Sequence, residues 1–292
     1  MVRRGGADYE GNAQSGGSAL KIGIVNASSR FSRERADAVH AWFAANVPDG
    51  SIKVVFHPAS FGKHGHFGGD DASRAAAFVE YANDPRLDAV WFARGGYGSC
   101  RIAEAVLPRL TDMARKKRYL GYSDAGTLLA ALYRAGFPHV AHGPMASDAV
   151  RNDAAAWRAL NWLKRGDPAS WEPSLHEDPR PAAAFNLSIL DALVGTYVEP
   201  DLTGHVLMLE DVSEPLYRVD RMMFHLTAQP SIRRVAGIRL GRVSDIVEND
   251  PDFGLTPEEI VRYWCQRSGI AYLGAADIGH DRDNKVVPFG SR

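Results

Sequence analysis

Residues 119–125 read YLGYSDA and pass from an apolar strand, through a sharp turn, into a helix. Ser123 stands at the turn, with Gly121 and Ala125 two positions to either side, and such a turn requires small residues there for steric reasons. The serine hydroxyl is expected at the carboxyl end of the strand, where the following backbone N–H groups point toward a developing oxyanion. Taken alone, however, the segment favours a helix cap by Ser123 or Asp124 over a nucleophile.

The alternation of strand and helix continues outward from this turn in both directions. The predicted elements are strands at 21–25, 52–56, 88–93 and 118–122 and from 140, with helices at 33–45, 70–81 and 124–135. Strands that alternate with helices in this way form parallel sheets, so residues 20–165 are predicted to be an α/β domain. In such sheets ligands gather at the carboxyl ends of the strands.

The pattern changes after residue 165. Residues 166–184 carry four prolines and little periodicity, and they are predicted to be a linker. Beyond it, the predicted elements are strands at 205–209, 237–246 and 270–273 and helices at 187–194, at 217–227 and from Thr256, where Glu259 can complete a capping box. We therefore expect residues 185–292 to form a smaller α+β domain, and residues 1–19, rich in Gly and Ser, to be a disordered leader.

The composition is that of an ordinary soluble protein. Hydrophobic residues make up 45% and charged residues 24% of the 292 residues, and the formal net charge is −1. Such a balance provides no global field that would recruit nucleic acid or an anionic membrane. No apolar run approaches the roughly 20 residues of a membrane span, and Cys100 and Cys265 are expected to be buried thiols. The sequence thus predicts a cytoplasmic protein that binds neither nucleic acid nor membrane.

A glycine-rich segment, ARGGYG at residues 93–98, follows another apolar strand. Glycines let the backbone approach a ligand closely and direct N–H groups at it. A phosphate-binding loop is the alternative, but no Gly-Lys-Ser/Thr follows and the spacing is not that of the dinucleotide fingerprint. A second oxyanion donor near Ser123 fits the segment better.

The second half of the chain offers a base and an orienting carboxylate. Glu210 and Asp211 follow the apolar run 206–209, and His280 lies in a polar loop before the last strand. A serine hydroxyl becomes a good nucleophile when an imidazole takes its proton and a carboxylate orients that imidazole. Asp211 competes with Glu210 for the orienting role, and Glu210 is favoured because it ends the alternation of the strand.

Taken together, these segments resemble the LD-carboxypeptidases of peptidoglycan recycling and their relatives, the microcin C immunity peptidases. The resemblance runs nearly the length of the chain, through residues 22–25, 67–70 with Arg74, 93–98, 121–124, 142–144, 186–187, 195–196, 209–211, 220–221, 279–280 and 288–290. It implies a flavodoxin-like amino-terminal domain and a smaller carboxy-terminal domain, with the site in the cleft between them.

The resemblance also implies the roles of individual residues. Ser123 would be the nucleophile, Glu210 the orienting carboxylate and His280 the general base, with the N–H groups of Gly96 and Asp124 forming the oxyanion hole. The residues expected to contact the substrate are Gly95, Tyr97 and Asn186. Members of this family are cytoplasmic homodimers without metal or other cofactor, and they release terminal D-alanine from murein tetrapeptides.

Other interpretations stay open at this point. A relative that hydrolyses a microcin-type aminoacyl-nucleotide amide would need an aromatic platform, for which Trp171 is the candidate. A binding module with the same cleft and no enzymatic activity is a third. His64 and His66 could ligate a metal with Asp70 or Asp71, but a helix cap is the favoured role of these aspartates. The chain departs from the family pattern at 184–185, which leaves its substrate preference open.

Overall fold

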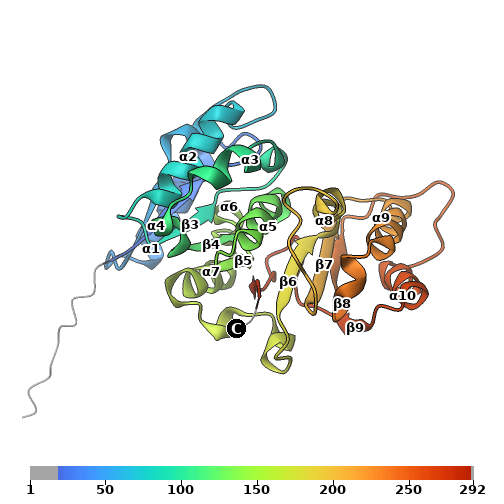
Figure 1. Cartoon of the computed structure of the whole chain (residues 1–292). Helices are drawn as coiled ribbons and strands as arrows, with labels where there is room; N and C mark the ends of the chain where they lie inside the picture. The colour runs from blue at the N-terminus through green and yellow to red at the C-terminus, as the bar shows by residue number, and fades with distance from the viewer. Residues whose placement is uncertain (1–18, 291–292) are drawn as a thin grey trace, which may run out of the picture.

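The first of two sheets is built mainly from the amino-terminal half of the chain and is completed by its last strand (Figure 1). The computed structural model describes residues 19–290. The strands of this first sheet, in spatial order, are β10 (Val287–Pro288), β5 (Val140–His142), β4 (Arg118–Gly121), β3 (Ala89–Phe92), β1 (Leu20–Val25) and β2 (Ile52–Phe56). Strands β1 to β5 are parallel and follow the flavodoxin order 2-1-3-4-5. The order reverses at β1, so a ligand crevice is expected beyond the carboxyl ends of β1 and β3.

Helices cover both faces of this sheet. One face packs against α1 (Arg33–Asn46), α6 (Ala146–Ala149) and α7 (Asp153–Arg165), and the other against α2 (Asp71–Asn83), α3 (Ala103–Val106), α4 (Asp112–Arg115) and α5 (Gly126–Arg134). All four residues of β3 are buried, as expected of a central strand with helices on both sides.

The second sheet has four strands in sequence order, β6 (Ala182–Asn186), β7 (Val206–Val212), β8 (Gly237–Ser244) and β9 (Tyr272–Ala275). Helices α8 (Leu187–Leu193), α9 (Leu216–Ala228) and α10 (Pro257–Ser268) pack on one of its faces. The predicted capping box of α10 is confirmed, because Thr256 Oγ1 accepts from the Glu259 N–H and the Glu259 carboxylate from the Thr256 N–H. The predicted fold class is confirmed as well, with one correction: every strand pair of the second sheet is parallel, so its arrangement is α/β and not α+β.

The end of the chain joins the two sheets. It leaves the second sheet after β9 and returns to the first, where β10 pairs antiparallel with β5 (Figure 1). Gly290 also exchanges backbone hydrogen bonds of 2.9 and 3.2 Å with Ala182 of β6. One hydrophobic core runs through both regions, from α5 to Phe185 and Phe289. The last segment therefore fixes how the second sheet sits against the first.

The expected domain boundaries differ from the elements in detail. Strand β6 begins at Ala182, inside the expected linker 166–184, and β10 belongs to the first sheet although it lies in 185–292. The expected leader, 1–19, lies outside the described residues except for Ala19. Both cysteines are free, but only Cys265 is buried; the expectation was wrong for Cys100, which is exposed. Within residues 19–290, no helix combines the length and apolar character that crossing a membrane would require.

Candidate active site

The turn that carries the predicted nucleophile, residues 121–125, is called the nucleophile turn below; it presents Ser123 at the carboxyl end of β4. Ser123 has a φ of 56°, in the left-handed region that few non-glycine residues occupy. Backbone outliers of this kind cluster at active sites, and a serine at a strained strand-to-helix turn exposes its hydroxyl. A Cβ at Gly121 would come within 2.7 Å of the Phe92 ring, so this position needs glycine.

Neither residue of the turn caps the helix that follows, so the interpretation of this segment as a cap was wrong. The Ser123 hydroxyl forms no hydrogen bond with another residue in the described range 19–290, which leaves it open to a base and a substrate. The Asp124 carboxylate instead accepts hydrogen bonds from the Gly98 N–H (3.3 Å), the Ser99 N–H (2.9 Å) and the Ser28 hydroxyl (2.5 Å).

Asp124 thereby ties the nucleophile turn to the glycine loop, residues 93–98. The buried side chain of Arg74 supports the same loop, because its Nη1 donates to the carbonyl of Gly98 at 2.9 Å and to that of Ala27. A Cβ on Gly95 would lie 2.9 Å from Ser123 Oγ, which shows how closely the loop approaches the serine. The two segments that carry the predicted oxyanion donors are thus held as one unit.

Ser29, at the carboxyl end of β1, holds the glycine loop from the other side. Its hydroxyl accepts a hydrogen bond from the Tyr97 N–H at 3.0 Å and lies 2.6 Å from Nε2 of His66. Gly96 has a φ of +115°, and a Cβ there would come within 2.2 Å of Ser29 Oγ, so only glycine fits. The Gly96 N–H hydrogen-bonds to no other residue among those described, so it is available to a ligand.

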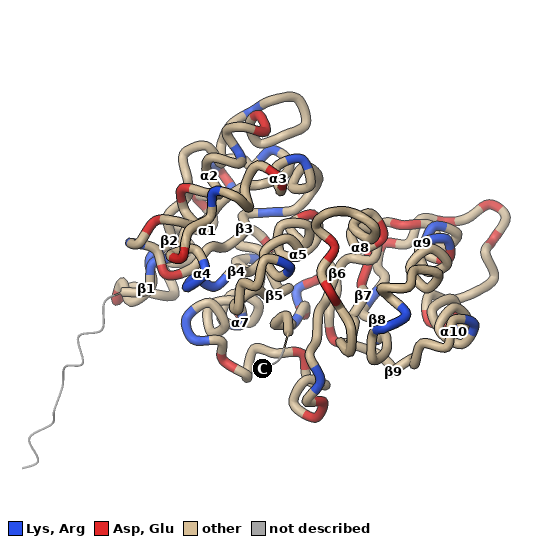
Figure 2. The backbone as a smooth tube through the Cα atoms, in the orientation of Figure 1, with Lys and Arg blue, Asp and Glu red and all other residues tan. Residues whose placement is uncertain are grey.

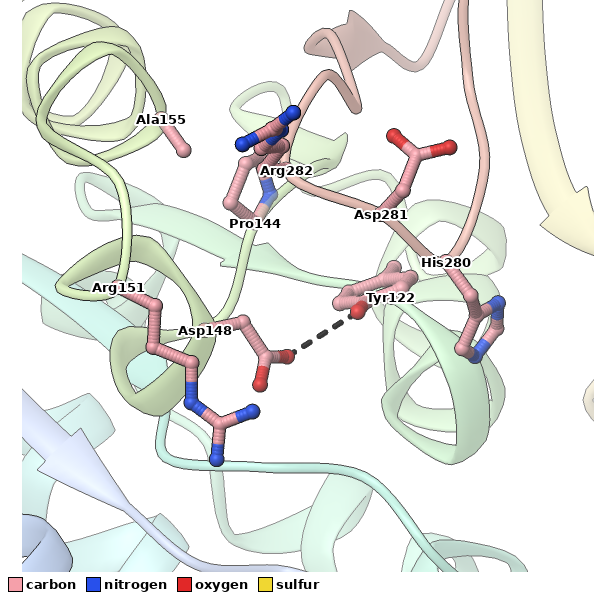
Figure 3. Close-up of a pocket in the computed structure, with 8 residues that line it drawn as sticks. All are labelled: Tyr122, Pro144, Asp148, Arg151, Ala155, His280, Asp281 and Arg282. Atoms are coloured by element: carbon pink, nitrogen blue, oxygen red, sulfur yellow. Dashed lines mark hydrogen bonds between the residues drawn. The ribbon is translucent and has the colours of Figure 1, made fainter.

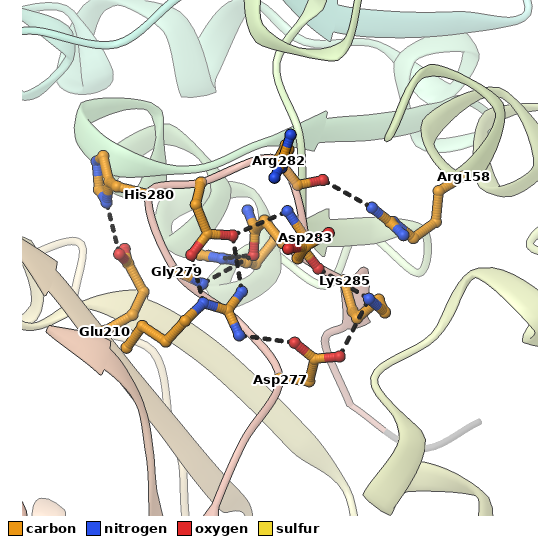
Figure 4. Close-up of polar contacts among 12 residues, drawn as sticks. Arg158, Glu210, Asp277, Gly279, His280, Arg282, Asp283 and Lys285 are labelled. Carbon is orange, nitrogen blue, oxygen red and sulfur yellow. Dashed lines mark hydrogen bonds and ion pairs between the residues drawn. The ribbon is translucent and has the colours of Figure 1, made fainter. Parts of the chain in front are cut away.

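Glu210 and His280 meet at the carboxyl end of the second sheet. Nδ1 of His280 donates to Oε2 of Glu210 at 2.5 Å (Figure 4), and the Glu210 side chain is completely buried. The register of β7 against β8 shifts between Leu209 and Asp211, a bulge that re-aims the side chain between them. With Nδ1 occupied by the carboxylate, Nε2 of His280 is left to exchange a proton with a substrate or a serine.

The His280 ring lies against the nucleophile turn. Its centroid is 4.8 Å from that of Tyr122, the residue immediately before Ser123. Burial alone would lower the pKa of His280, but the hydrogen bond and negative charge of Glu210 outweigh it, and the pKa of His280 is raised above its usual value. The structure therefore brings Glu210 and His280 together and places them beside the turn that carries Ser123.

The segment that carries His280, residues 277–285, is called the base loop below. Arg242 of β8 donates to Asp277 (2.6 Å) and to both carboxylate oxygens of Asp281 (2.9 Å for Nη2 to Oδ1), and Lys285 pairs with Asp277 at 3.0 Å. Figure 4 shows these contacts around Asp277 together with the Glu210–His280 pair.

Asn284 links the base loop to the first sheet. Its Oδ1 accepts from the Gly279 N–H at 3.2 Å and lies 3.3 Å from Nε2 of the buried His142 of β5. Burial lowers the pKa of His142 to about 4, so this imidazole is neutral at pH 7. His142 thus contacts a side chain of the base loop from the first sheet.

The other predicted residues lie at varying distances from this centre. Tyr97 is half exposed on the glycine loop. Asn186 caps α8 and donates to Asp211 at 3.0 Å, so its predicted contact with substrate stays a prediction. Asp211 also accepts from the Ser188 N–H at 3.0 Å, and burial raises its pKa to about 6. It does not hydrogen-bond to His280.

For a metal, the described residues offer no group of three or more His, Cys, Asp or Glu side chains arranged to hold one. Of the histidine pair, His66 contacts Ser29, and Asp70 caps α2 by accepting from the Ser73 N–H at 2.6 Å.

Three supporting residues were missed in the sequence: Ser29, Arg242 and Asn284. Ser29 ends the polar turn that follows the predicted strand 21–25, so its place at the sheet edge could have been found from the rule that ligands gather at the carboxyl ends of parallel strands. Arg242 and Asn284 act on the base loop through contacts between segments far apart in the chain, for which no local pattern exists.

Comparison with known proteins identifies the relatives of this chain. The family model for the LD-carboxypeptidase N-terminal domain matches residues 22–143, and that for the LD-carboxypeptidase C-terminal domain matches residues 183–292. A murein tetrapeptide carboxypeptidase of Pseudomonas aeruginosa is 26% identical over 223 residues, covering 70% of this chain and 71% of the relative. A Streptomyces coelicolor protein that carries a carboxypeptidase name is 30% identical over 287 residues, covering 92% and 88%.

Solved structures share the fold over almost the whole chain. A muramoyltetrapeptide carboxypeptidase from Oxalobacter formigenes superposes with a TM-score of 0.74 at 22% identity, over 93% of both chains. The microcin C7 self immunity protein MccF superposes with a TM-score of 0.77 at 18% identity, over 94% of this chain and 92% of that one. At these identities the likeness establishes the two-sheet architecture and leaves the choice of substrate open.

Proposed function

The chain belongs to the LD-carboxypeptidase family, and we propose that it hydrolyses the bond between an L-centre and the terminal D-alanine of murein tetrapeptides. As a member of this family it is a serine peptidase, and therefore a hydrolase. The released amino acid would return to peptidoglycan synthesis. We further propose, from the family resemblance, that it acts in the cytoplasm as a homodimer, which sedimentation of the purified protein would test.

In the proposed mechanism Nε2 of His280 takes the proton of the Ser123 hydroxyl as Oγ attacks the scissile carbonyl carbon. The imidazolium that forms is stabilised by the Glu210 carboxylate, which already accepts from Nδ1 at 2.5 Å. In this structure the serine hydroxyl is free, so its hydrogen bond to His280 forms when substrate closes the site, as is common in unliganded enzymes.

The tetrahedral intermediate places negative charge on the former carbonyl oxygen. We assign its stabilisation to the N–H groups of Gly96 and Asp124, which the contacts of Ser29 and the Asp124 carboxylate hold on either side of the serine. Each such donor contributes about 3 kcal/mol to catalysis. The intermediate collapses as His280 returns its proton to the leaving amine, and water then hydrolyses the acyl-enzyme by the same route in reverse.

One observation carries this proposal above the others. The buried Glu210–His280 pair comes from the second region and ends with its imidazole 4.8 Å from the ring of Tyr122, next to a serine in the left-handed conformation. A simple binding module has no need of a buried charge pair beside a strained serine, since both features are costly to fold.

The proposal is tested by incubating the wild type and Ser123→Ala with a murein tetrapeptide that ends in D-alanine. We expect the wild type to release free D-alanine and Ser123→Ala to be at least about 10⁴-fold slower. Wild-type protein quenched during turnover should also show the mass of an acyl group on Ser123. Equal release by the two proteins would eliminate Ser123 as the nucleophile.

The alternative substrate, an aminoacyl-nucleotide amide, requires a platform for the nucleobase. The centroid of the Trp171 ring lies 6.1 Å from that of His176, in a stacked arrangement, and the ring packs against buried hydrophobic residues of both regions. Trp171 does not line the pocket that contains His280, which is described in the next subsection. This placement favours the muropeptide. Turnover of the tetrapeptide and of an aspartyl sulfamoyl adenosine, measured side by side, decides between them.

A further inference from the structure

A pocket beside His280 carries two positive charges that the mechanism above leaves unused. It has a volume of about 140 Å³ and is lined by Tyr122, Pro144, Asp148, Arg151, Ala155, His280, Asp281 and Arg282 (Figure 3). Arg151 lies between α6 and α7, and Arg282 lies in the base loop, so the two guanidinium groups reach the pocket from different segments. Neither guanidinium forms a hydrogen bond or ion pair with a residue in 19–290. The hydrogen bonds of Arg151 and Arg282 within this range are made by their main-chain groups.

The acidic groups of the pocket leave this charge uncompensated. Asp281 is paired with Arg242 through both carboxylate oxygens, so its charge is neutralised from outside the pocket. Asp148 accepts a hydrogen bond from the Tyr122 hydroxyl at 3.1 Å and one from the Ser147 hydroxyl at 3.4 Å. Among the lining residues, Arg151 and Arg282 therefore carry two positive charges against the single uncompensated carboxylate of Asp148, and the pocket lining has a net positive charge.

The position of the pocket matches the path of the leaving group. His280 must deliver a proton to the leaving nitrogen, so the residue that departs lies on the His280 side of Ser123. In a substrate cut at its last residue, the carbon next to that nitrogen bears the free terminal carboxylate. A carboxylate is also the group that a guanidinium binds best, through two parallel hydrogen bonds.

We propose that this pocket is the subsite for the terminal D-amino acid, with Arg151 and Arg282 binding its carboxylate. This inference rests on the proposed function and adds to it the residues that restrict the enzyme to the end of a chain. A substrate whose terminal carboxylate is capped as an amide loses both ion pairs.

The test compares two substrates in four proteins. The substrates are the tetrapeptide ending in D-alanine and the same peptide ending in D-alanine amide; the proteins are the wild type, Arg151→Gln, Arg282→Gln and the double variant. We expect the wild type to prefer the acid by at least about 100-fold in kcat/KM, because the amide cannot form the two charge-assisted contacts with Arg151 and Arg282. In the double variant kcat/KM should fall about 100-fold for the acid and change less than about 3-fold for the amide.

Three controls separate a subsite from a structural effect. Arg86→Gln removes an exposed arginine paired with Asp84 in the first region and should leave the preference unchanged. The rate at which a fluorophosphonate labels Ser123 should be the same in all variants, because this reagent carries no carboxylate. Arg282→Lys should recover part of the preference for the acid.

The possible outcomes are distinct. If the wild type releases D-alanine and the double variant keeps the full preference for the acid, the proposed subsite is wrong and the proposed function stands. A wild type that labels with the phosphonate but releases no D-alanine would overturn the proposed function, and the subsite with it.

Discussion

The two regions that build the site are held in place by different kinds of contact. The nucleophile turn and the glycine loop are joined by buried groups: the Asp124 carboxylate, the Arg74 guanidinium and the Ser29 hydroxyl. The base loop is held largely by ion pairs of Arg242 and Lys285, whose side chains are part exposed. Lys and Arg lie among Asp and Glu over both regions, with neither sign confined to one (Figure 2).

The two kinds of contact should hold the two regions with different strength. Buried hydrogen bonds to charged groups are costly to break, whereas part-exposed ion pairs contribute little to stability and are screened by salt. Ser123 and the proposed oxyanion donors are therefore fixed by the first region, while the approach of His280, the proposed base, depends on contacts that solvent can weaken. Substitutions on the two sides should consequently have different signatures.

The largest effect is expected from Glu210→Gln, which removes the buried charge behind His280. We expect kcat/KM to fall by about 10⁴-fold, because the imidazole loses both its orientation and the partner of its positive charge. Asp211→Asn is the matched control, since Asp211 is the next residue and is also buried but does not hydrogen-bond to His280. A loss of similar size in Asp211→Asn would mean that the orienting carboxylate has been assigned to the wrong residue.

The same variant makes a prediction for pH dependence. Glu210 raises the pKa of His280 above its usual value of 6.5, and the mechanism needs this imidazole unprotonated. Wild-type kcat/KM should therefore fall as the pH drops through a value above 6.5, and the residual activity of Glu210→Gln should persist to lower pH. An acid limb at the same pH in both proteins would contradict the coupling.

A smaller effect is expected from Ser29→Ala, in the first region, where buried hydrogen bonds hold the glycine loop. The substitution removes the acceptor of the Tyr97 N–H next to Gly96, so the oxyanion donor is less well placed. We expect kcat to fall about 10-fold with KM almost unchanged, because an oxyanion donor acts mainly in the transition state. A change confined to KM would show that Ser29 supports substrate binding instead.

The smallest effect is expected from Arg242→Gln, on the side of the base loop. The free energy of unfolding should fall by no more than about 1 kcal/mol, since the ion pairs of Arg242 are part exposed. We expect kcat to fall a few-fold, and wild-type kcat to decrease modestly in high salt while Arg242→Gln no longer responds. Denaturant unfolding and kcat at two ionic strengths measure both quantities.

Much of this fold could be predicted because its signals are local. The α/β alternation, the turn at Ser123 and the capping box at Thr256 depend on neighbouring residues, and each was found close to its predicted position. The parallel pairing of the second sheet and the return of β10 to the first depend on contacts between distant segments. The hydrophobic periodicity of a segment does not identify the strand with which it pairs, so these features were not predicted.

The site shows the same limit. Ser123, Glu210 and His280 were predicted from residue type, order and a family resemblance, but the hydrogen bond between Glu210 and His280 and the approach of His280 to Tyr122 are properties of the tertiary fold. Two features of the site cannot be predicted from the local sequence. They are the bulge in β7 that directs Glu210 and the hydrogen bonds of Asn284, which connect His142 to the base loop. Ser123 looked most like a helix cap in its own segment, and only the neighbouring glycine loop and the distant pair changed that interpretation.

The central claim is that a serine fixed by one region is activated by a histidine from the other. The most direct test is the rate at which a fluorophosphonate labels Ser123, located by peptide mass, in the wild type and in His280→Ala. We expect rapid labelling of the wild type at Ser123 and labelling at least about 10³-fold slower in His280→Ala with the fold intact. Equal labelling rates in the two proteins would contradict it.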